Sequence, residues 1–220
     1  MSDGTLYIGN KRYSSWSMRG WLAVRLARLD VEEISIPFAR PGPTPAIAAL
    51  SPNGLVPYLE HKGAKVWESL SVCDYCAECE PSLWPADRIA RAHARSISAE
   101  MHAGFRDLRM AMWMNLGRDF SPHGRTPAAL ENIARIETIW ADTRTRFGAG
   151  GPFLFGAAFG AADAMYAPVV GRFLGWKPEL TAVSLDYCNA VRAHPLVAEW
   201  YEAAKTEPNS MLVDDYETLK

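Results

Sequence analysis

The first eighty residues switch between short apolar runs and apolar positions with helical spacing. Short apolar runs bounded by turn residues predict strands, and apolar positions that recur every three or four residues predict helices. The runs predict strands at residues 5–8, 33–38, 56–60 and 65–67. The helical spacing covers residues 17–29 and 69–80, with one helical turn at 45–50 inside a proline-rich loop. The predicted order is strand, helix, strand, short helix, hairpin, helix.

This order predicts a small mixed sheet. A strand–helix–strand unit implies a parallel pair, and the hairpin adds antiparallel strands. The segment Pro-Ser-Leu-Trp-Pro at 81–85 breaks the pattern and indicates a linker. Only helical patterns follow it, at residues 87–114, 127–147, 161–174, 185–193 and 195–205. We therefore expect an α/β domain over residues 1–83 and an all-helical domain over residues 88–220.

Composition narrows the class of protein. Hydrophobic residues make up 49% of the 220 positions and charged residues 22%, which is typical of a globular protein with an ordinary core. The net charge of −2 and the lack of a basic tract argue against nucleic-acid or membrane partners. The polar N-terminal stretch does not resemble a signal peptide, and no run approaches membrane-span length. Three of the four cysteines fall in one predicted helix, so we expect reduced thiols and a cytoplasmic location.

Three serines gather just before the first predicted helix. The segment Arg12–Arg19 has the sequence Arg-Tyr-Ser-Ser-Trp-Ser-Met-Arg and contains Ser14, Ser15 and Ser17. A helix N-terminus carries unpaired N–H groups and a partial positive charge, so an anion such as a thiolate is stabilised there. Serine is also a favoured N-cap, and a simple capping role stays open.

Two further clusters lie near the predicted hairpin. Pro57 stands just inside an apolar strand, where a cis peptide could turn the backbone of Val56 toward an extended peptide ligand. A trans proline in an edge strand fits the same pattern. Glu68 and Ser69 open the helix after the hairpin, where Ser69 could bind a ligand carboxylate and Glu68 an ammonium group. The alternative is a capping serine with an acidic neighbour.

At these spacings and on this order of strands, the three clusters together resemble the cytosolic glutathione S-transferases. The nearest likeness is to their zeta-like group, which includes the maleylacetoacetate isomerases and has the first-helix motif Ser-Ser-Cys-Ser-x-Arg. Here that motif stands as Ser-Ser-Trp-Ser-Met-Arg at residues 14–19. The likeness extends from Leu6 to about Glu202. It implies an N-terminal thioredoxin-like βαβαββα domain, an all-helical C-terminal domain and a homodimer.

The resemblance also implies roles for the serines. Ser14 would be the catalytic residue, donating a hydrogen bond to the sulfur of glutathione and holding it as the thiolate. Ser15 and Ser17 would contribute to the glutathione site. All three lie near the same helix end, so the residues alone leave open which one contacts sulfur.

The remaining clusters would bind the rest of the co-substrate. By the resemblance, Val56 before a cis Pro57 would pair its backbone with the cysteinyl unit of glutathione. Glu68 and Ser69 would bind its γ-glutamyl end. Leu55 stands where zeta-like proteins often have a polar residue, so one side-chain contact with glutathione could be missing.

The electrophile pocket is harder to predict. Trp16 replaces the cysteine of the zeta motif, which weakens an isomerase assignment more than it weakens glutathione binding. In the family, the long helix predicted at 87–114 faces the sulfur and the dimer interface. We choose Trp16, Met101, Phe105 and Arg109 as pocket candidates. An ordinary core stripe, formed with Leu108, Met112 and Trp113, is the alternative.

Two other patterns bear on the prediction. The repeat Cys73-x-x-Cys76-x-x-Cys79 spreads its sulfurs around a helix without an adjacent fourth ligand, so we expect no metal. A dithiol mechanism at the first helix is excluded because serines stand at both positions. Asp163 resembles the acidic half of the family's capping box, whose other half is Gly160 instead of Ser or Thr.

The favoured function is therefore conjugation of glutathione to hydrophobic electrophiles. A glutathione-dependent cis–trans isomerase of the maleylacetoacetate type is the first alternative. A binding protein without catalytic activity is the second.

Overall fold

The computed structural model describes residues 2–39 and 42–207. Its sheet has the strand order β2-β1-β3-β4. The strands are β1 (Gly4–Ile8), β2 (Glu32–Ser35), β3 (Tyr58–His61) and β4 (Ala64–Trp67). β1 pairs in parallel with β2 and antiparallel with β3, and β3 and β4 form the hairpin. The mixed sheet expected from the sequence is thus confirmed.

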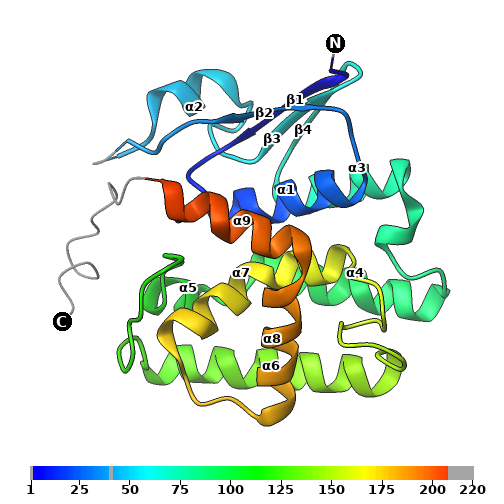
Figure 1. The fold of residues 1–220 in the computed structure, drawn as a ribbon, viewed down its shortest axis with the longest axis vertical. Helices are drawn as coiled ribbons and strands as arrows, with labels where there is room; N and C mark the ends of the chain where they lie inside the picture. Colours follow the sequence, from blue (N-terminus) through cyan, green and yellow to red (C-terminus); the bar gives the residue numbers. More distant parts are fainter. Residues whose placement is uncertain (1, 40–41, 208–220) are drawn as a thin grey trace.

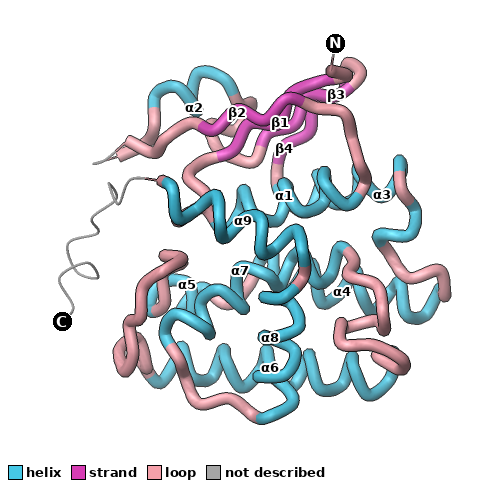
Figure 2. Tube along the Cα trace, viewed as in Figure 1, coloured by secondary structure: helices cyan, strands magenta, loops and turns pink. Residues whose placement is uncertain are grey.

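Helices cover both faces of this sheet. They are α1 (Ser15–Leu26), α2 (Pro45–Leu50) and α3 (Ser69–Cys79). Figure 1 shows α1 and α3 below the sheet, on the side of the helical part, and α2 above it. Figure 2 shows the strands confined to this end of the molecule. α1 and α3 therefore lie between the sheet and the helical part of the molecule.

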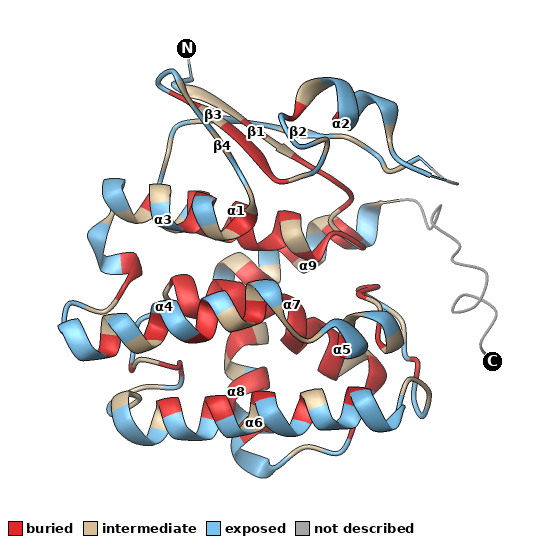
Figure 3. Cartoon of the chain, turned by 180° about the vertical axis from the view of Figure 1, so that it is seen from behind, coloured by how far each residue is buried: buried red, intermediate tan, exposed pale blue. Residues whose placement is uncertain are grey.

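The rest of the described chain is helical. It consists of η1 (Pro81–Leu83), a short 3-10 helix, and α4 (Arg88–Ala103), α5 (Arg106–Ala111), α6 (Pro127–Phe147), α7 (Ala161–Trp176), α8 (Ala182–Ala193) and α9 (Pro195–Thr206). Every residue from Ala161 to Phe173 is buried, so α7 runs through the core of this part (Figure 3). A helix that is apolar on all sides requires such a position. In the described ranges, no helix is both long and apolar enough to cross a membrane.

The helix predicted over residues 87–114 is wrong in its second half. The helix is interrupted at Gly104 and Phe105, between α4 and α5. Phe105 has a left-handed φ of 60°, and a Cβ on Gly104 would lie 2.8 Å from the carbonyl oxygen of Glu100. A continuous helix is therefore not formed. Met112 and Trp113 lie beyond α5, in the connection to α6.

The capping box of α7 is half formed, as the sequence predicts. Asp163 accepts hydrogen bonds from the backbone N–H groups of Gly160 and Leu154, at 3.0 Å each, and from the hydroxyl of Tyr187 at 3.0 Å. Burial nevertheless raises the pKa of Asp163 to about 6. A Cβ on Gly160 would lie 2.9 Å from the carbonyl oxygen of Leu83, so the close approach of η1 accounts for glycine at the N-cap.

Candidate active site

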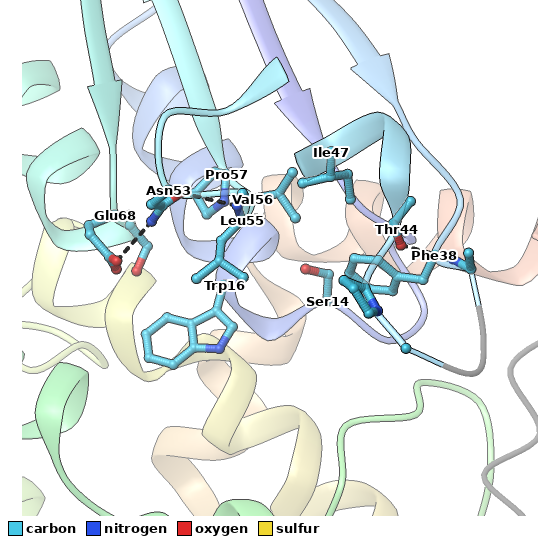
Figure 4. Close-up of a pocket in the computed structure, with 15 residues that line it drawn as sticks. Ser14, Trp16, Phe38, Thr44, Ile47, Asn53, Leu55, Val56, Pro57 and Glu68 are labelled. Carbon is cyan, nitrogen blue, oxygen red and sulfur yellow. Dashed lines mark hydrogen bonds between the residues drawn. The ribbon is translucent and has the colours of Figure 1, made fainter. Parts of the chain in front are cut away.

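A cavity of about 430 Å³ lies where three segments of the chain meet. Its lining comes from the start of α1, from the stretch that holds α2 and the approach to β3, and from the start of α3. Figure 4 shows Ser14 and Glu68 on opposite sides of this cavity, with Leu55 and Val56 between them. The fold therefore brings all three predicted clusters to one place.

Ser14 is the N-cap of α1 and lines the cavity. Its Oγ accepts a hydrogen bond from the backbone N–H of Ser17 at 3.2 Å and donates to the Oγ of Ser17 at 2.7 Å. The Oγ of Ser17 also accepts the N–H of Gly9 at 2.9 Å, and Ser17 is fully buried. Ser17 thus ties the end of β1 to the first turn of α1 and supports Ser14 from behind.

Ser15 turns toward the helical part of the molecule. Its Oγ accepts a hydrogen bond from Nη2 of Arg172, on α7, at 3.2 Å. Among the three serines, Ser14 lines the cavity, whereas Ser15 and Ser17 do not. The structure therefore gives the three neighbouring hydroxyls three different environments.

Trp16 lines the cavity and also reaches toward the helical part. The guanidinium carbons of Arg19 and Arg109 lie 4.7 Å and 4.6 Å from the centre of its ring. His102, on α4, meets the ring edge-on with a centroid distance of 5.3 Å. Cation–π contacts of this kind hold an indole in one orientation, so Trp16 forms a fixed part of the cavity wall.

The buried Arg19 and Arg172 form a positive cluster behind Trp16 together with the partly buried Arg109. Burial lowers the pKa of Arg19, and the charges of Arg109 and Arg172 lower it further. Burial likewise lowers the pKa of Arg109 to about 10 and that of Arg172 to about 9. Backbone carbonyl groups compensate part of this charge: Nε of Arg19 donates to Met165 at 2.9 Å, and Nε of Arg109 to Gly104 at 3.1 Å.

Glu68 and Ser69 form the opposite end of the cavity. Glu68 has an unusual φ of 68°, which costs conformational energy in a residue other than glycine. Nδ2 of Asn53 donates to Oε1 of Glu68 at 3.1 Å, and Nε2 of His102 lies 3.5 Å from Oε2. The hydroxyl of Ser69 is buried, and no other described group is its hydrogen-bond partner. A buried hydroxyl without a partner is costly, which points to a ligand group.

The Val56–Pro57 peptide bond is cis, as the resemblance implies. Both residues line the cavity next to the exposed side chain of Leu55. Pro57 packs directly on α1, because a Cβ on Gly20 would lie 2.7 Å from its Cγ. Glycine at position 20 thus allows the loop that carries Val56 to approach the helix that carries Ser14.

The other pocket candidates do not line this cavity. Met101 is buried at the end of α4, and Phe105 occupies the break between α4 and α5. Arg109 donates to the carbonyl groups of Met101, His102 and Gly104, so it caps the C-terminal end of α4. Of the four residues that the sequence suggests for the electrophile, Trp16 is the one in the cavity lining.

Asn53 and His102 also belong to the site, although the sequence did not predict them. Oδ1 of Asn53 accepts the backbone N–H of Leu55 at 3.0 Å, which is an Asx turn, and Asn-Gly is its sequence signal. No sequence pattern indicated His102, because it comes close to Glu68 only through the packing of α4 against α3. Burial lowers the pKa of His102, as do Arg19 and Arg109, whereas Glu68 raises it.

The cysteines lie outside this site. Cys73 and Cys76 are buried, and burial raises the pKa of Cys73 to about 12, so its thiol stays protonated at neutral pH. Cys79 is exposed. Within residues 2–39 and 42–207, no group of three or more His, Cys, Asp or Glu side chains is placed to hold a metal ion.

Comparison with solved structures defines the class of protein. A glutathione transferase homologue from Burkholderia with bound glutathione matches with a TM-score of 0.69 and 21% identity, over 93% of this chain and 99% of that chain. The monomeric glutathione S-transferase Na-GST-3 from the hookworm Necator americanus matches with a TM-score of 0.70 and 18% identity, over 94% and 98%. The chain therefore has the two-part glutathione transferase fold, with a thioredoxin-like first part.

Sequence comparison gives the family. Residues 13–79 match the glutathione S-transferase N-terminal domain, and residues 125–203 match the C-terminal domain. The chain belongs to the glutathione S-transferase family. It is also 32% identical, over 105 residues, to a probable maleylacetoacetate isomerase from Caenorhabditis elegans. That match spans about half of each protein, 47% of this chain and 48% of the relative.

Proposed function

We propose that this protein conjugates glutathione to hydrophobic electrophiles, with Ser14 as the residue that activates the thiol. The observation that carries the proposal is the convergence of two hydroxyls on one cavity. Ser14 lines it at the N-terminus of α1. Ser69, whose hydroxyl has no hydrogen-bond partner within residues 2–39 and 42–207, lines it at the N-terminus of α3. A peptide with a thiol and a carboxylate fits this pair of helix ends.

The chemistry required of Ser14 is modest. A free thiol with a pKa of about 8.5 is only slightly ionised at neutral pH, and each unit of lowering needs about 1.4 kcal/mol. A hydrogen bond to a charged group, together with the helix N-terminus, supplies that amount. The hydroxyls of Ser14 and Ser17 lie 2.7 Å apart, so their hydrogen bond can reverse. Ser17 then donates to Ser14, and Ser14 donates to the sulfur.

The other groups hold the rest of glutathione. We assign the backbone of Val56, before the cis Pro57, to the cysteinyl unit. Ser69 and the first N–H groups of α3 receive the γ-glutamyl carboxylate, and Glu68 receives the ammonium group. The side chain of Glu68 makes no capping hydrogen bond, which leaves the start of α3 available to an anion.

The reaction then needs little further help. The thiolate attacks an electrophilic carbon, the carbon–sulfur bond forms, and the leaving group departs with its electron pair or the product takes up a proton. The thiol proton goes to solvent. Position and thiol activation are the protein's contributions. We assign Trp16 to the wall of the electrophile pocket. Met101, Phe105 and Arg109 lie outside the cavity lining and stay candidates for the remainder of that pocket.

The proposal extends to the assembly. We propose a cytoplasmic homodimer, with residues 1–83 and 88–220 as its two domains, residues 208–220 lying outside the described ranges. The hookworm relative is described as monomeric, so family membership does not decide the state of this chain. Sedimentation velocity of the purified protein measures it directly: a sedimenting mass near twice the 24.4 kDa of the chain supports the dimer.

A second candidate function is glutathione-dependent cis–trans isomerisation. The similarity to the probable maleylacetoacetate isomerase favours it. In that reaction the thiolate adds to a conjugated double bond, rotation follows, and elimination returns glutathione. Turnover of a cis-enone without consumption of glutathione would distinguish this function from conjugation.

Calorimetry of glutathione binding, with conjugation of a chloronitrobenzene assayed alongside, tests the proposal. We expect binding and turnover by the unmodified protein. Binding without turnover of either substrate class would indicate a binding protein on this fold. No binding at all would contradict the whole proposal.

A further inference from the structure

The turn at Lys11 and Arg12, just before Ser14, makes backbone hydrogen bonds to the helical part of the molecule. The backbone N–H groups of Lys11 and Arg12 donate to the two carboxylate oxygens of Glu207, at 2.7 Å and 3.0 Å. The carbonyl of Lys11 accepts the indole N–H of Trp200 at 2.9 Å. The carbonyl of Arg12 accepts the N–H of Leu116 at 3.1 Å. All four backbone polar groups of these two residues are therefore satisfied from the helical part.

The position of Glu207 is unusual for a carboxylate. It is the C-cap of α9, where the partial negative charge of the helix end disfavours an acid. The two charge-assisted hydrogen bonds to the turn offset this disadvantage. The carboxylate of Glu207 thus stabilises the turn at Lys11 and Arg12 and does not stabilise its own helix.

Helix α9 is itself fixed against α1. The rings of Trp200 and Trp21 lie 5.3 Å apart, and Nη2 of Arg25 donates to Oε2 of Glu199 at 3.0 Å. These contacts lie along α9 before Glu207. The helix that carries the glutamate is therefore packed on α1 and paired with it.

The turn passes this constraint to Ser14. Immediately before Lys11, the carbonyl of Asn10 accepts the N–H of Tyr13 at 3.2 Å and that of Ser14 at 2.8 Å. Oδ1 of Asn10 accepts the N–H of Phe38 at 2.8 Å, from a residue of the cavity wall. A displacement of Lys11 and Arg12 would therefore move the backbone of Ser14 relative to the cavity.

We propose that Glu207 is a positioning residue for Ser14. It acts through the backbone of the turn and fixes the distance between the Ser14 hydroxyl and the sulfur of bound glutathione. The inference rests on the proposed thiol activation by Ser14. Displacements of about 1 Å in a reacting group reduce rates strongly. Glu207 therefore affects the reaction rate from outside the cavity, through the position of Ser14.

The test is the pKa of the bound glutathione thiol, followed by the ultraviolet absorbance of the thiolate against pH. In Glu207→Gln, the side chain keeps one acceptor oxygen and turns an amide N–H₂ toward the second backbone N–H. We expect the thiol pKa to rise by about one unit. At neutral pH, kcat should fall several-fold and by no more than about tenfold, while the Kd for glutathione changes less than about threefold.

Two further variants complete the experiment. Glu202→Gln, on the exposed side of α9 and paired with Lys205, is the matched control and should retain the wild-type thiol pKa. Trp200→Phe removes the hydrogen bond to the Lys11 carbonyl but keeps a ring in place. This variant should also raise the pKa of the bound glutathione thiol. It provides the test if Glu207→Gln does not fold.

The outcomes separate this inference from the proposed function. If the wild-type protein lowers the thiol pKa and the variants at 207 and 200 leave it unchanged, Glu207 is only structural and the inference is overturned. If the wild-type protein binds glutathione without forming the thiolate, the proposed activation by Ser14 is wrong, and the inference falls with it.

Discussion

At the residue scale, the site depends on hydroxyl groups that differ in their partners. Ser14 and Ser69 both stand at helix N-termini and both line the cavity. Ser14 already has hydrogen bonds to Ser17, whereas the buried hydroxyl of Ser69 has no described partner. We infer that the hydroxyl of Ser14 is positioned to stabilise the thiolate of glutathione. The hydroxyl of Ser69, in contrast, gains its hydrogen-bond partner from the bound ligand.

The first prediction concerns Ser69→Ala. The variant should weaken glutathione binding about tenfold, because one hydrogen bond to a carboxylate contributes roughly 1.5 kcal/mol. The catalytic constant at saturating glutathione should remain close to that of the wild type, since the sulfur lies at the other end of the peptide. Calorimetry and steady-state kinetics measure the two effects.

The control for this variant is Ser71→Ala, an exposed serine in the same turn of α3. It should leave both the Kd and the catalytic constant unchanged. Equal effects of the two substitutions would show that Ser69 acts through helix stability and not through the ligand.

Among the serines, the sequence could predict only the cluster. Serines at a helix start indicate an anion site, and that much follows from local pattern. The choice among Ser14, Ser15 and Ser17 depends on distant partners. Arg172, which donates a hydrogen bond to Ser15, lies 157 residues away along the chain. No local rule relates such positions, so sequence reasoning could not separate the three hydroxyls.

At the scale of elements, the ends of helices are set by close approaches of the backbone. The N-cap of α7 is Gly160, where the family's capping box usually has Ser or Thr. The missing side chain is explained by η1, whose Leu83 carbonyl oxygen would lie 2.9 Å from a Cβ. Asp163 then supplies the remaining half of the cap.

The second prediction concerns Gly160→Ser. Capping propensity alone predicts a more stable protein, because serine is a better N-cap than glycine by a few tenths of a kcal/mol. The close approach to Leu83 predicts the opposite, a loss of about 1 kcal/mol or more in the free energy of unfolding. Urea denaturation measures the sign. A stabilised variant would show that η1 moves away without cost.

The break between α4 and α5 illustrates where pattern reasoning fails. Apolar positions at helical spacing continue through residues 101–113, and they predict one helix. The left-handed φ of Phe105 is not foreseeable, because bulky residues rarely adopt it. Gly104 was the available signal, since glycine often ends a helix. Arg109 then caps the carbonyl groups that this break leaves unpaired.

At the scale of the whole molecule, the partly buried side chain of His194 makes stability depend on pH. His194 joins α8 to α9, and its ring stacks on Phe159 with a centroid distance of 4.2 Å. Burial lowers its pKa in the folded protein. The unfolded chain, with an ordinary histidine pKa of about 6.5, therefore takes up more protons as the pH falls. The stability contributed by neutral His194 is present above that value and is lost below it.

The third prediction follows from this sign. Between about pH 7 and pH 5, the wild-type protein should lose more of its unfolding free energy than His194→Gln does. Asp163, whose raised pKa is about 6, has the opposite effect, but it is present in both proteins and cancels in the comparison. Denaturant titrations across this pH range measure the difference. Parallel curves for the two proteins would exclude His194 as a contributor.

The overall architecture was the most predictable level. Strand and helix patterns are local, and their order along the chain was sufficient for the mixed sheet and the helical part that follows it. Contacts between the two parts were not predictable. Glu207 reaches Lys11 across almost the whole chain, and only the packing of α9 on α1 brings them together.

The central claim is that the Ser14 hydroxyl lowers the pKa of the glutathione thiol. The most direct measurement is the ultraviolet pH titration of bound glutathione in the wild type and in Ser14→Ala, with Ser15→Ala as the neighbouring control. We predict a thiol pKa below the free value of about 8.5 in the wild type and in Ser15→Ala, and a return toward 8.5 in Ser14→Ala. The same low pKa in Ser14→Ala would contradict the account and move thiol activation to another group.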